Sequence, residues 1–251
     1  MGKPRIGLLV TCLVDLFRPA VGFATISLLE SAGCEVFVPI QTCCGQPAYN
    51  GGDRESATEI ARDVIGRFEE FDYVVAPSGS CIGMLHQYPL LFADDDPWRS
   101  RAVALAERSF EVTSFLVSVM DFEMAPRPST RPVVYHDACA GLRELAIKQQ
   151  PRQLLGQAGV EVHELPDAEV CCGFGGTFCV KYPEISTAMS TQKVESIVAS
   201  GVKILAAGDM GCLLNLAGAL SRQGSDVEVR HVVELLQGAV DVAPIGGQEA
   251  G

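Results

Sequence analysis

The tripeptide Cys43-Cys44-Gly45 occurs a second time in the chain, as Cys171-Cys172-Gly173. Each copy has one further cysteine before it and one after it: Cys12 and Cys81 in the first half, Cys139 and Cys212 in the second. Matching cysteines lie 127, 128 and 131 residues apart, so one supersecondary unit is used twice with little slippage. The repeat predicts two similar halves, each with a site for a metal that prefers sulfur ligands.

Strand and helix patterns alternate around these cysteines. In the first half we expect strands at 5–10, 35–39 and 73–76, and helices at 16–32 and 53–71. In the second half we expect strands at 132–135, 160–165 and 202–207, and helices at 142–158 and 184–200. Each strand runs into a cysteine. The alternation predicts an α/β fold of two tandem, pseudo-symmetric parallel-sheet units, with sites at the carboxyl ends of the strands.

The repeat also predicts domain boundaries. Residues 1–93 form the first repeat and residues 132–240 the second, whereas 94–131 connect them through a helix at 99–122 and a proline-rich linker. Three prolines between 126 and 132 cannot sustain a helix or a central strand. Residues 241–251, rich in glycine and small side chains, are expected to form a flexible tail.

Composition excludes several classes of protein. A chain of 251 residues with 48% hydrophobic and 20% charged residues can bury a core, which argues against disorder. The net charge of −12 opposes binding to nucleic acid or anionic lipid. No apolar run reaches the roughly 18 residues of a membrane helix, so we expect no direct membrane insertion. We expect a cytoplasmic protein that touches a membrane, if at all, through partners.

The ten cysteines favour metal binding over disulfides, because disulfide scaffolds are short, secreted and poor in core. Neighbouring cysteines such as Cys43 and Cys44 are poor disulfide partners, but their divergent thiolates can reach two metal atoms. This favours a polynuclear iron-sulfur cluster over a single zinc ion. Gly45 and Gly173 would let the backbone approach a bulky cluster with positive φ. Cys34 and Cys179 lie outside the repeat, and we interpret both as small buried side chains.

His136 is the strongest candidate beyond the cysteines, because it lies three residues before Cys139. Its imidazole could replace a thiolate on iron or donate a hydrogen bond to a cluster sulfur; a capping histidine at the strand end is the alternative. No phosphate-binding, serine-hydrolase, zincin or dinucleotide motif is present in the sequence. We therefore predict no catalytic residue in the chain and expect flavin or nicotinamide chemistry on a partner.

Several segments together resemble a known family. They are Thr11-Cys12-Leu13-Val14-Asp15, Gln41-Thr42-Cys43-Cys44-Gly45-Gln46-Pro47, Ser78-Gly79-Ser80-Cys81, His136-Asp137-Ala138-Cys139 and Cys171-Cys172-Gly173-Phe174-Gly175-Gly176. The chain resembles, over about residues 4–237, the cysteine-rich or CCG-domain proteins. These include a subunit of heterodisulfide reductase and the iron-sulfur subunits of glycolate and glycerol-3-phosphate oxidising enzymes.

The resemblance implies electron transfer in the oxidation of L-lactate to pyruvate, by a non-autonomous oxidoreductase subunit beside other iron-sulfur subunits. It implies one or two clusters, of the 4Fe-4S type, with the eight repeated cysteines as ligands: Cys12, Cys43, Cys44, Cys81, Cys139, Cys171, Cys172 and Cys212. Glycolate, glycerol 3-phosphate or another hydroxy acid would leave the same cysteines in place. His136, Gly45 and Gly173 are expected around the ligands.

The chain departs from the family at one position in each half. The family motif ends each half in Cys-x-x-Cys, whereas this chain has Met84 and Asn215 at the second position. Four thiolates per half therefore remain, for an ordinary four-thiolate cluster, a modified cluster or zinc. Two alternatives stay open: a zinc-stabilised scaffold or binding module, and a thiol/disulfide oxidoreductase subunit like that of heterodisulfide reductase.

Overall fold

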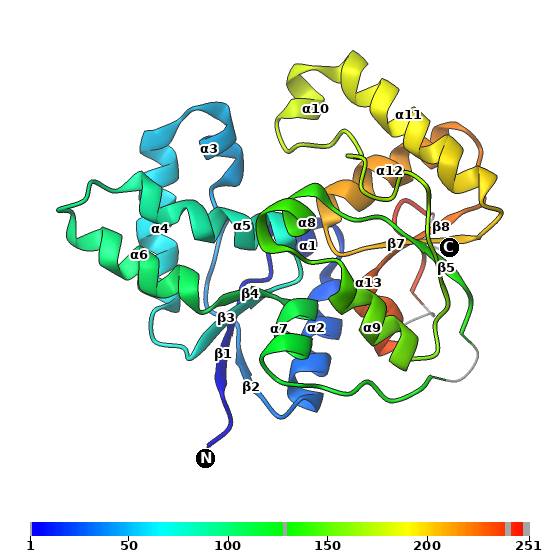
Figure 1. Cartoon of the computed structure of the whole chain (residues 1–251). Coiled ribbons are helices and arrows are strands. Elements are labelled where there is room, and N and C mark those ends of the chain that lie inside the picture. The colour runs from blue at the N-terminus through cyan, green and yellow to red at the C-terminus, as the bar shows by residue number, and fades with distance from the viewer. Residues whose placement is uncertain (1, 128–129, 239–241, 248–251) are drawn as a thin grey trace. The chain divides into compact units, whose positions relative to one another are not determined.

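The computed structural model describes residues 2–127, 130–238 and 242–247. The chain forms two compact units, Met1–Met120 and Asp121–Gly251, which are described separately (Figure 1). Both combine a parallel sheet with helices, so the predicted α/β class and the internal duplication are confirmed. Among the described residues, no helix combines the length and the apolar composition needed to cross a membrane.

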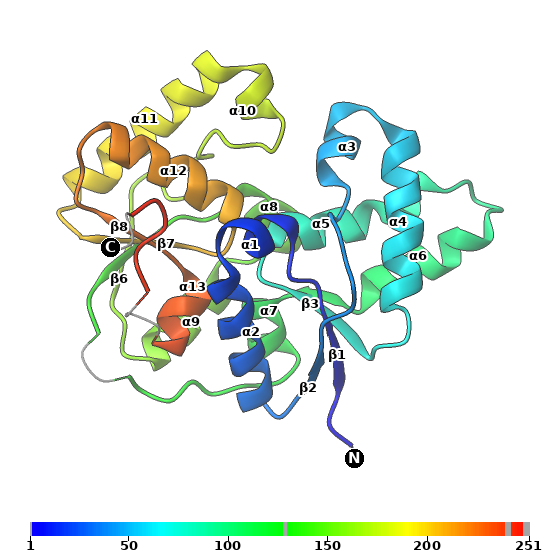
Figure 2. The same cartoon turned by 180° about the vertical axis from the view of Figure 1, so that it is seen from behind.

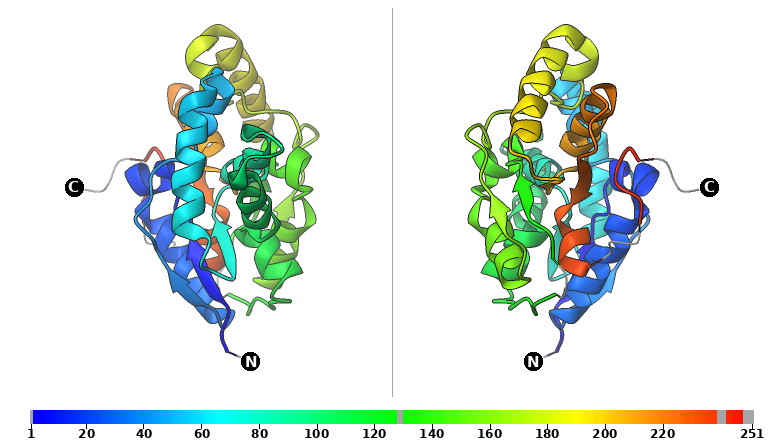
Figure 3. Two further views of the ribbon diagram at one scale, coloured as in Figure 1. Left: turned by 90° about the vertical axis from the view of Figure 1, so that its left-hand side faces the viewer. Right: turned by 90° about the vertical axis from the view of Figure 1, so that its right-hand side faces the viewer.

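Unit 1 contains a four-stranded parallel sheet in the order β2-β1-β3-β4. Its elements are β1 (Arg5–Leu8), α1 (Cys12–Phe17), α2 (Pro19–Ser31), β2 (Glu35–Phe37), α3 (Gln46–Gly51), α4 (Arg54–Phe68), β3 (Tyr73–Ala76), α5 (Gly79–Gln87), η1 (Tyr88–Leu91), α6 (Pro97–Glu107), β4 (Ser109–Glu111) and α7 (Val112–Ser118). In the central strands β1 and β3, the side chains of Ile6, Leu8, Val74 and Val75 are fully buried, as expected for a sheet covered on both faces. Helices α3, α4 and α6 lie side by side (Figures 1 and 3).

Unit 2 repeats this topology with the strand order β6-β5-β7-β8, again all parallel. Its elements are β5 (Val133–Tyr135), α8 (Cys139–Leu145), α9 (Gln149–Gln157), β6 (Val162–His163), α10 (Phe178–Lys181), α11 (Pro183–Ala199), β7 (Ile204–Ala207), α12 (Met210–Arg222), β8 (Glu228–His231) and α13 (Val232–Gln237). Helices α11 and α12 pack against each other (Figures 1 and 2).

The two units match residue by residue at the strands that lead to the cysteines. Gly7 pairs with Val74 between β1 and β3, and Val134 pairs with Leu205 between β5 and β7. Just beyond the strands, the Leu9 amide donates to the Val75 carbonyl at 2.8 Å. In unit 2 the His136 amide donates to the Ala206 carbonyl at 2.9 Å. Leu9 and His136 therefore occupy equivalent positions.

The structure corrects several predicted elements. The expected helix at 99–122 consists of two helices, α6 and α7, separated by strand β4, which pairs with β3 inside unit 1. Strand β8 was likewise not predicted. The helix expected at 16–32 is two helices divided at Pro19, which begins α2, and the helix expected at 142–158 is interrupted at Ala146, with a φ of 54°. Of the expected linker and tail, residues 128–129, 241 and 248–251 lie outside the described residues.

Candidate metal centres

Helix N-termini position four of the eight repeated cysteines. Cys12 begins α1 and Cys139 begins α8. Cys81 is the third residue of α5 and Cys212 the third residue of α12, after the capping residues Ser78 and Asp209. Each of these helices follows a strand of its sheet, so its N-terminus lies at the carboxyl edge. Helix N-termini carry partial positive charge, which would stabilise these cysteines as thiolates once a metal has displaced their protons.

The vicinal cysteines lie on a tight loop whose glycine has a left-handed backbone. Gly45 has a φ of 84° and Gly173 a φ of 86°. The Gly45 amide approaches the Cys43 sulfur at 3.4 Å, and the Gly173 amide approaches the Cys171 sulfur at the same distance. The positive φ expected at both glycines is confirmed, and their amides provide hydrogen-bond donors for sulfur.

The four thiols of each unit form an outer and an inner pair, which a contact between the two vicinal cysteines links. The outer pair is half-buried: Cys12 and Cys43 are 3.9 Å apart between sulfurs, and Cys139 and Cys171 are 4.0 Å apart. We call the buried pairs, Cys44 with Cys81 and Cys172 with Cys212, the inner pairs; their thiols are hydrogen-bonded. All ten cysteines lie within the described residues and are free thiols. The structure thus brings the eight predicted ligands together in two groups of four, one in each unit. That they bind a metal stays a prediction.

Hydrogen bonds among the thiols give the cysteines of each site different pKa values. The Cys12 thiol donates to Cys43, which, with a further thiol donor in Cys44, lowers the pKa of Cys43 to about 2. The same bond raises the pKa of Cys12. In unit 2 the donors Cys139 and Cys172 lower the pKa of Cys171 to about 2. The Cys172 thiol and the His136 ring also lower the pKa of Cys212. A metal that takes all four sulfurs of a site must displace the protons that remain on them.

A side chain from the following helical segment fixes the second cysteine of each tripeptide. In unit 1 the buried Tyr88 hydroxyl donates to the Cys44 carbonyl at 2.8 Å. In unit 2 the Asn215 amide donates to the Cys172 carbonyl at 2.9 Å. Asn215 stands where the family motif has its fifth cysteine, so this position has a structural role. Its counterpart Met84 is buried and apolar.

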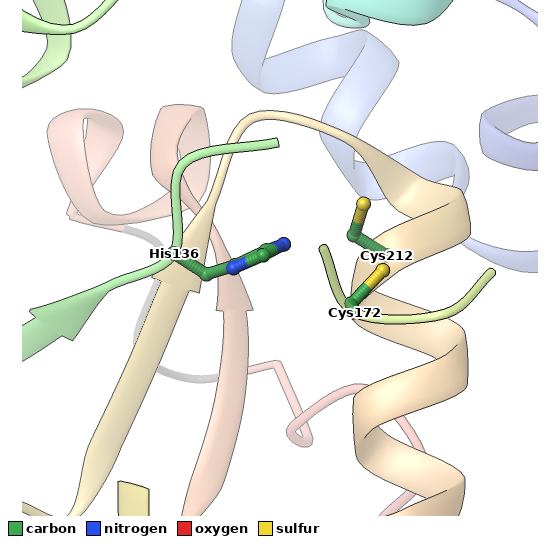
Figure 4. Close-up of side chains that lie close together, drawn as sticks. All are labelled: His136, Cys172 and Cys212. Carbon is green, nitrogen blue, oxygen red and sulfur yellow. The ribbon is translucent and has the colours of Figure 1, made fainter. Parts of the chain in front are cut away.

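His136 lies beside the inner pair of unit 2. Its imidazole is fully buried, and neither ring nitrogen makes a hydrogen bond of standard geometry. One ring nitrogen and the sulfurs of Cys172 and Cys212 all lie within 4.8 Å of one another (Figure 4). The Cys172 thiol and the His136 imidazole both lower the pKa of Cys212, so the ring interacts with the inner pair.

Further charged groups surround the unit 2 site. The Asp137 carboxylate, 1% exposed, receives two hydrogen bonds of 2.8 Å from the Arg152 guanidinium. Lys193, whose side chain is fully buried, pairs with Asp167 at 3.5 Å. Burial lowers the pKa of Lys193, although Asp167 opposes the shift. In unit 1, Val10 stands at the position that corresponds to Asp137, and its amide donates to the Gln41 side chain at 2.7 Å. The two sites therefore share their thiols but differ in the polar groups beside them.

The outer pair of unit 1 opens to a pocket of about 470 Å³. Cys12 and Cys43 line it together with Leu16 and Ile40, whose side chains are 72% and 83% exposed.

Cys34 and Cys179 are not part of either site. Cys34 is buried against Met120, with 3.9 Å between the sulfurs, as expected. Cys179 is only half-buried and donates to the Gly176 carbonyl, which differs from the expected buried side chain.

Known proteins match both the sequence and the fold. The family of the cysteine-rich domain, CCG, matches residues 6–86 and 133–217. A lactate utilization protein A from an Exiguobacterium species is 45% identical over 96% of this chain and its own full length. A lactate utilization protein A from Bacillus cytotoxicus is 44% identical over 92% of this chain and 98% of its own length.

A solved structure of a hypothetical protein from Helicobacter pylori has a TM-score of 0.64 and 9% sequence identity. The match covers 99% of this chain and 52% of the Helicobacter pylori protein, so this chain spans about half of that protein's length. The likeness concerns the fold alone. The sequence matches cover both halves and all eight cysteines of the two sites. The chain therefore belongs to the family of cysteine-rich CCG-domain proteins.

Proposed function

We propose that this chain is an iron-sulfur electron-transfer subunit of a system that oxidises L-lactate to pyruvate. Its eight paired cysteines would hold one cluster in each unit: Cys12, Cys43, Cys44 and Cys81 in unit 1, and Cys139, Cys171, Cys172 and Cys212 in unit 2. A bound cluster supplies a site that accepts and releases one electron at a time.

The arrangement of each vicinal cysteine pair carries the proposal. Cys43 contacts Cys12 and also its neighbour Cys44, which in turn contacts Cys81. Cys171 and Cys172 link Cys139 to Cys212 in the same way. A row of four thiols joined through two neighbouring cysteines suits a group with more than one metal atom better than a single ion. The same arrangement in both units favours a polynuclear cluster over an isolated zinc ion.

The surroundings also suit electron transfer. The inner pairs are buried, the outer pairs are half-buried, and backbone amides point at the outer sulfurs Cys43 and Cys171. Hydrogen bonds to sulfur and partial burial are the means by which a protein sets a cluster potential. The half-buried outer pairs would bring each cluster near the surface, where a partner can exchange electrons with it.

The assignment to lactate rests on the names of the relatives, lactate utilization protein A. Oxidation of L-lactate to pyruvate releases two electrons and two protons. The sequence holds no flavin or nicotinamide fingerprint, so a partner subunit would take the electron pair from the substrate. This chain would then pass the electrons on singly, beside other iron-sulfur subunits.

The cofactor is tested on the full chain, purified without oxygen. We expect brown protein with iron and acid-labile sulfide in comparable amounts and an electron paramagnetic resonance signal after reduction. Cys43→Ser and Cys171→Ser should each lose the contribution of one unit, whereas Cys34→Ser, outside both sites, should keep the full iron content. Colourless protein that carries only zinc would reject the electron-transfer function and favour the zinc scaffold.

The substrate is tested on a complex isolated through a tag on this chain. We expect L-lactate to bleach the cluster absorption only when the partner subunits are present. Glycolate and glycerol 3-phosphate are the matched controls, because their electrons could reach the same cysteines. Bleaching by one of these compounds and not by L-lactate would reject lactate as the substrate.

A further inference from the structure

We propose that His136 is a metal ligand in unit 2, so that this unit holds its metal group through nitrogen and sulfur while unit 1 uses sulfur alone. The inference rests on the proposed metal-binding function and goes beyond it, since it makes the two centres chemically different. The group that we assign comprises His136, Cys172 and Cys212, whose three donor atoms lie within 4.8 Å of one another.

The backbone holds the imidazole at the site. His136 directly follows β5, and its amide continues the pairing with β7 through the Ala206 carbonyl. Cys212 comes from the N-terminal turn of α12 and Cys172 from the loop after β6. Figure 4 shows the imidazole reaching from the strand end toward both sulfurs. Three segments of unit 2 thus bring three donors of the types that iron and zinc both accept to one point.

A purely structural role explains the imidazole poorly. A capping histidine would hydrogen-bond backbone, but neither nitrogen of His136 does so, and the ring interacts instead with the Cys212 thiol. A space-filling role needs no nitrogen, because the equivalent position in unit 1 is Leu9, which is fully buried. By contrast, His231, a buried histidine of the same unit, accepts a hydrogen bond from the Val233 amide through Nδ1. A ligand on one nitrogen removes the unpaired acceptor that His136 otherwise buries.

The position of His136 relative to the two pairs defines what it adds. It approaches the inner pair, Cys172 and Cys212, whereas Cys139 and Cys171 contact each other in the outer pair. A metal atom held by the inner pair would thus have two thiolates and one imidazole. Neutral imidazole adds a donor without adding negative charge, so the unit 2 centre is easier to reduce than it would be with a fifth, anionic thiolate. We therefore expect the reduction potential of the unit 2 centre to fall in His136→Cys.

The test uses full-length protein with histidine labelled with ¹⁵N only in the imidazole ring, purified without oxygen. Pulsed electron paramagnetic resonance of the reduced protein should show strong nitrogen hyperfine coupling to one centre. His136→Leu, which copies Leu9, and His136→Cys, which supplies a fifth thiolate, should both lose the coupling. His163→Ala is the matched control: His163 lies in the same unit but is exposed, at 45%, and should leave the coupling unchanged.

The outcomes separate this inference from the proposed function. Iron in both units without imidazole coupling, or coupling that survives in His136→Cys, overturns the ligand role and leaves the electron-transfer function intact. Protein without iron rejects that function. In that case Co²⁺ added to reduced, metal-free protein decides the inference. A change in the visible cobalt spectrum between wild type and His136→Cys, absent in His163→Ala, supports a nitrogen ligand, and identical spectra overturn it.

Discussion

Replacing the glycine of each Cys-Cys-Gly tripeptide by alanine should have unequal effects in the two units. Gly45 and Gly173 share a positive φ, of 84° and 86°. A Cβ on Gly45 would meet the flexible Ile60 side chain at 3.3 Å. A Cβ on Gly173 would meet the backbone oxygen of Ser186 at 2.7 Å and the Met189 Cβ at 3.1 Å. The backbone conformation is thus the same, but only unit 2 places rigid atoms against the new methyl group.

Substitutions at two further glycines measure the cost of the left-handed backbone conformation alone. Gly52 has a φ of 86° and Gly201 a φ of 74°, and a Cβ on either meets no atom within 4 Å. The left-handed conformation costs alanine about 1–2 kcal/mol, of which the stiffer unfolded chain returns roughly 0.4–1 kcal/mol. We expect Gly52→Ala and Gly201→Ala to lower the free energy of unfolding by about 1 kcal/mol. Gly45→Ala should lie close to this value. Overpacking adds about 1–3 kcal/mol, so Gly173→Ala should cost about 2–4 kcal/mol.

Hydrogen exchange with mass spectrometry, on reduced and metal-free protein in urea, follows each unit separately. With a urea slope of about 2 kcal/mol per molar, the unit 2 midpoint should fall by about 1–2 M in Gly173→Ala and by about 0.5 M in Gly201→Ala. Unit 1 should keep its midpoint in both variants. If Gly173→Ala and Gly201→Ala shift the midpoint equally, the Ser186 contact does not limit the loop and the reasoning from crowding is refuted.

Three other perturbations test the surroundings of the thiols. Tyr88→Phe removes the donor to the Cys44 carbonyl and should destabilise unit 1 by about 1–3 kcal/mol in the same exchange assay, with unit 2 unchanged. Gly211→Ala would stabilise an ordinary helix by about 1 kcal/mol, but its Cβ would lie 2.2 Å from the Phe174 ring, so we expect destabilisation instead. Its cost should shrink in a Phe174→Ala background, and additive effects would contradict the contact. Because the pKa of Cys43 and of Cys171 is lowered to about 2, both stay thiolates as the pH falls. Peptide mapping of reduced, metal-free protein should find nearly equal iodoacetamide rates for them at pH 5.5 and 7.5, whereas an ordinary thiol would slow about 100-fold.

The sequence predicts the duplication and the gathering of the cysteines because both depend on local patterns. The strand β3, Tyr73–Ala76, was predicted to the residue, and helix α11 to within one residue at each end. Parallel strands that end in cysteines bring those cysteines to one edge whatever the loops do. Which four cysteines gather in each unit could therefore be predicted from the sequence without knowledge of the loops. Which thiol contacts which could not be predicted from the sequence, since it depends on side-chain directions within the loops.

The missed elements share a physical cause. Strand β4 has three residues and lies between two helices, so its pattern is too short to stand out from helical spacing. Its pairing with β3, for example of Phe110 with Val75, shows that the segment belongs to the sheet. Strand β8 is equally dependent on a neighbour, β7. Tyr88 and Asn215 were not predicted as partners of the cysteine carbonyls, because their contacts cross 44 and 43 residues of sequence.

The residues three positions after Cys81 and Cys212, Met84 and Asn215, have different structural roles in the two units. Asn215 itself donates to the Cys172 carbonyl from one turn beyond Cys212, whereas Met84 cannot donate, and Tyr88 does so from the next turn. Ala219, the counterpart of Tyr88 in unit 2, is buried, so a tyrosine there would overpack the core. The tyrosine of unit 1 therefore cannot be moved to unit 2 by a single substitution. The two units share four thiols but satisfy the equivalent backbone carbonyl with different side chains, and Leu9 and His136 differ at equivalent positions, so the surroundings of the two centres are not identical.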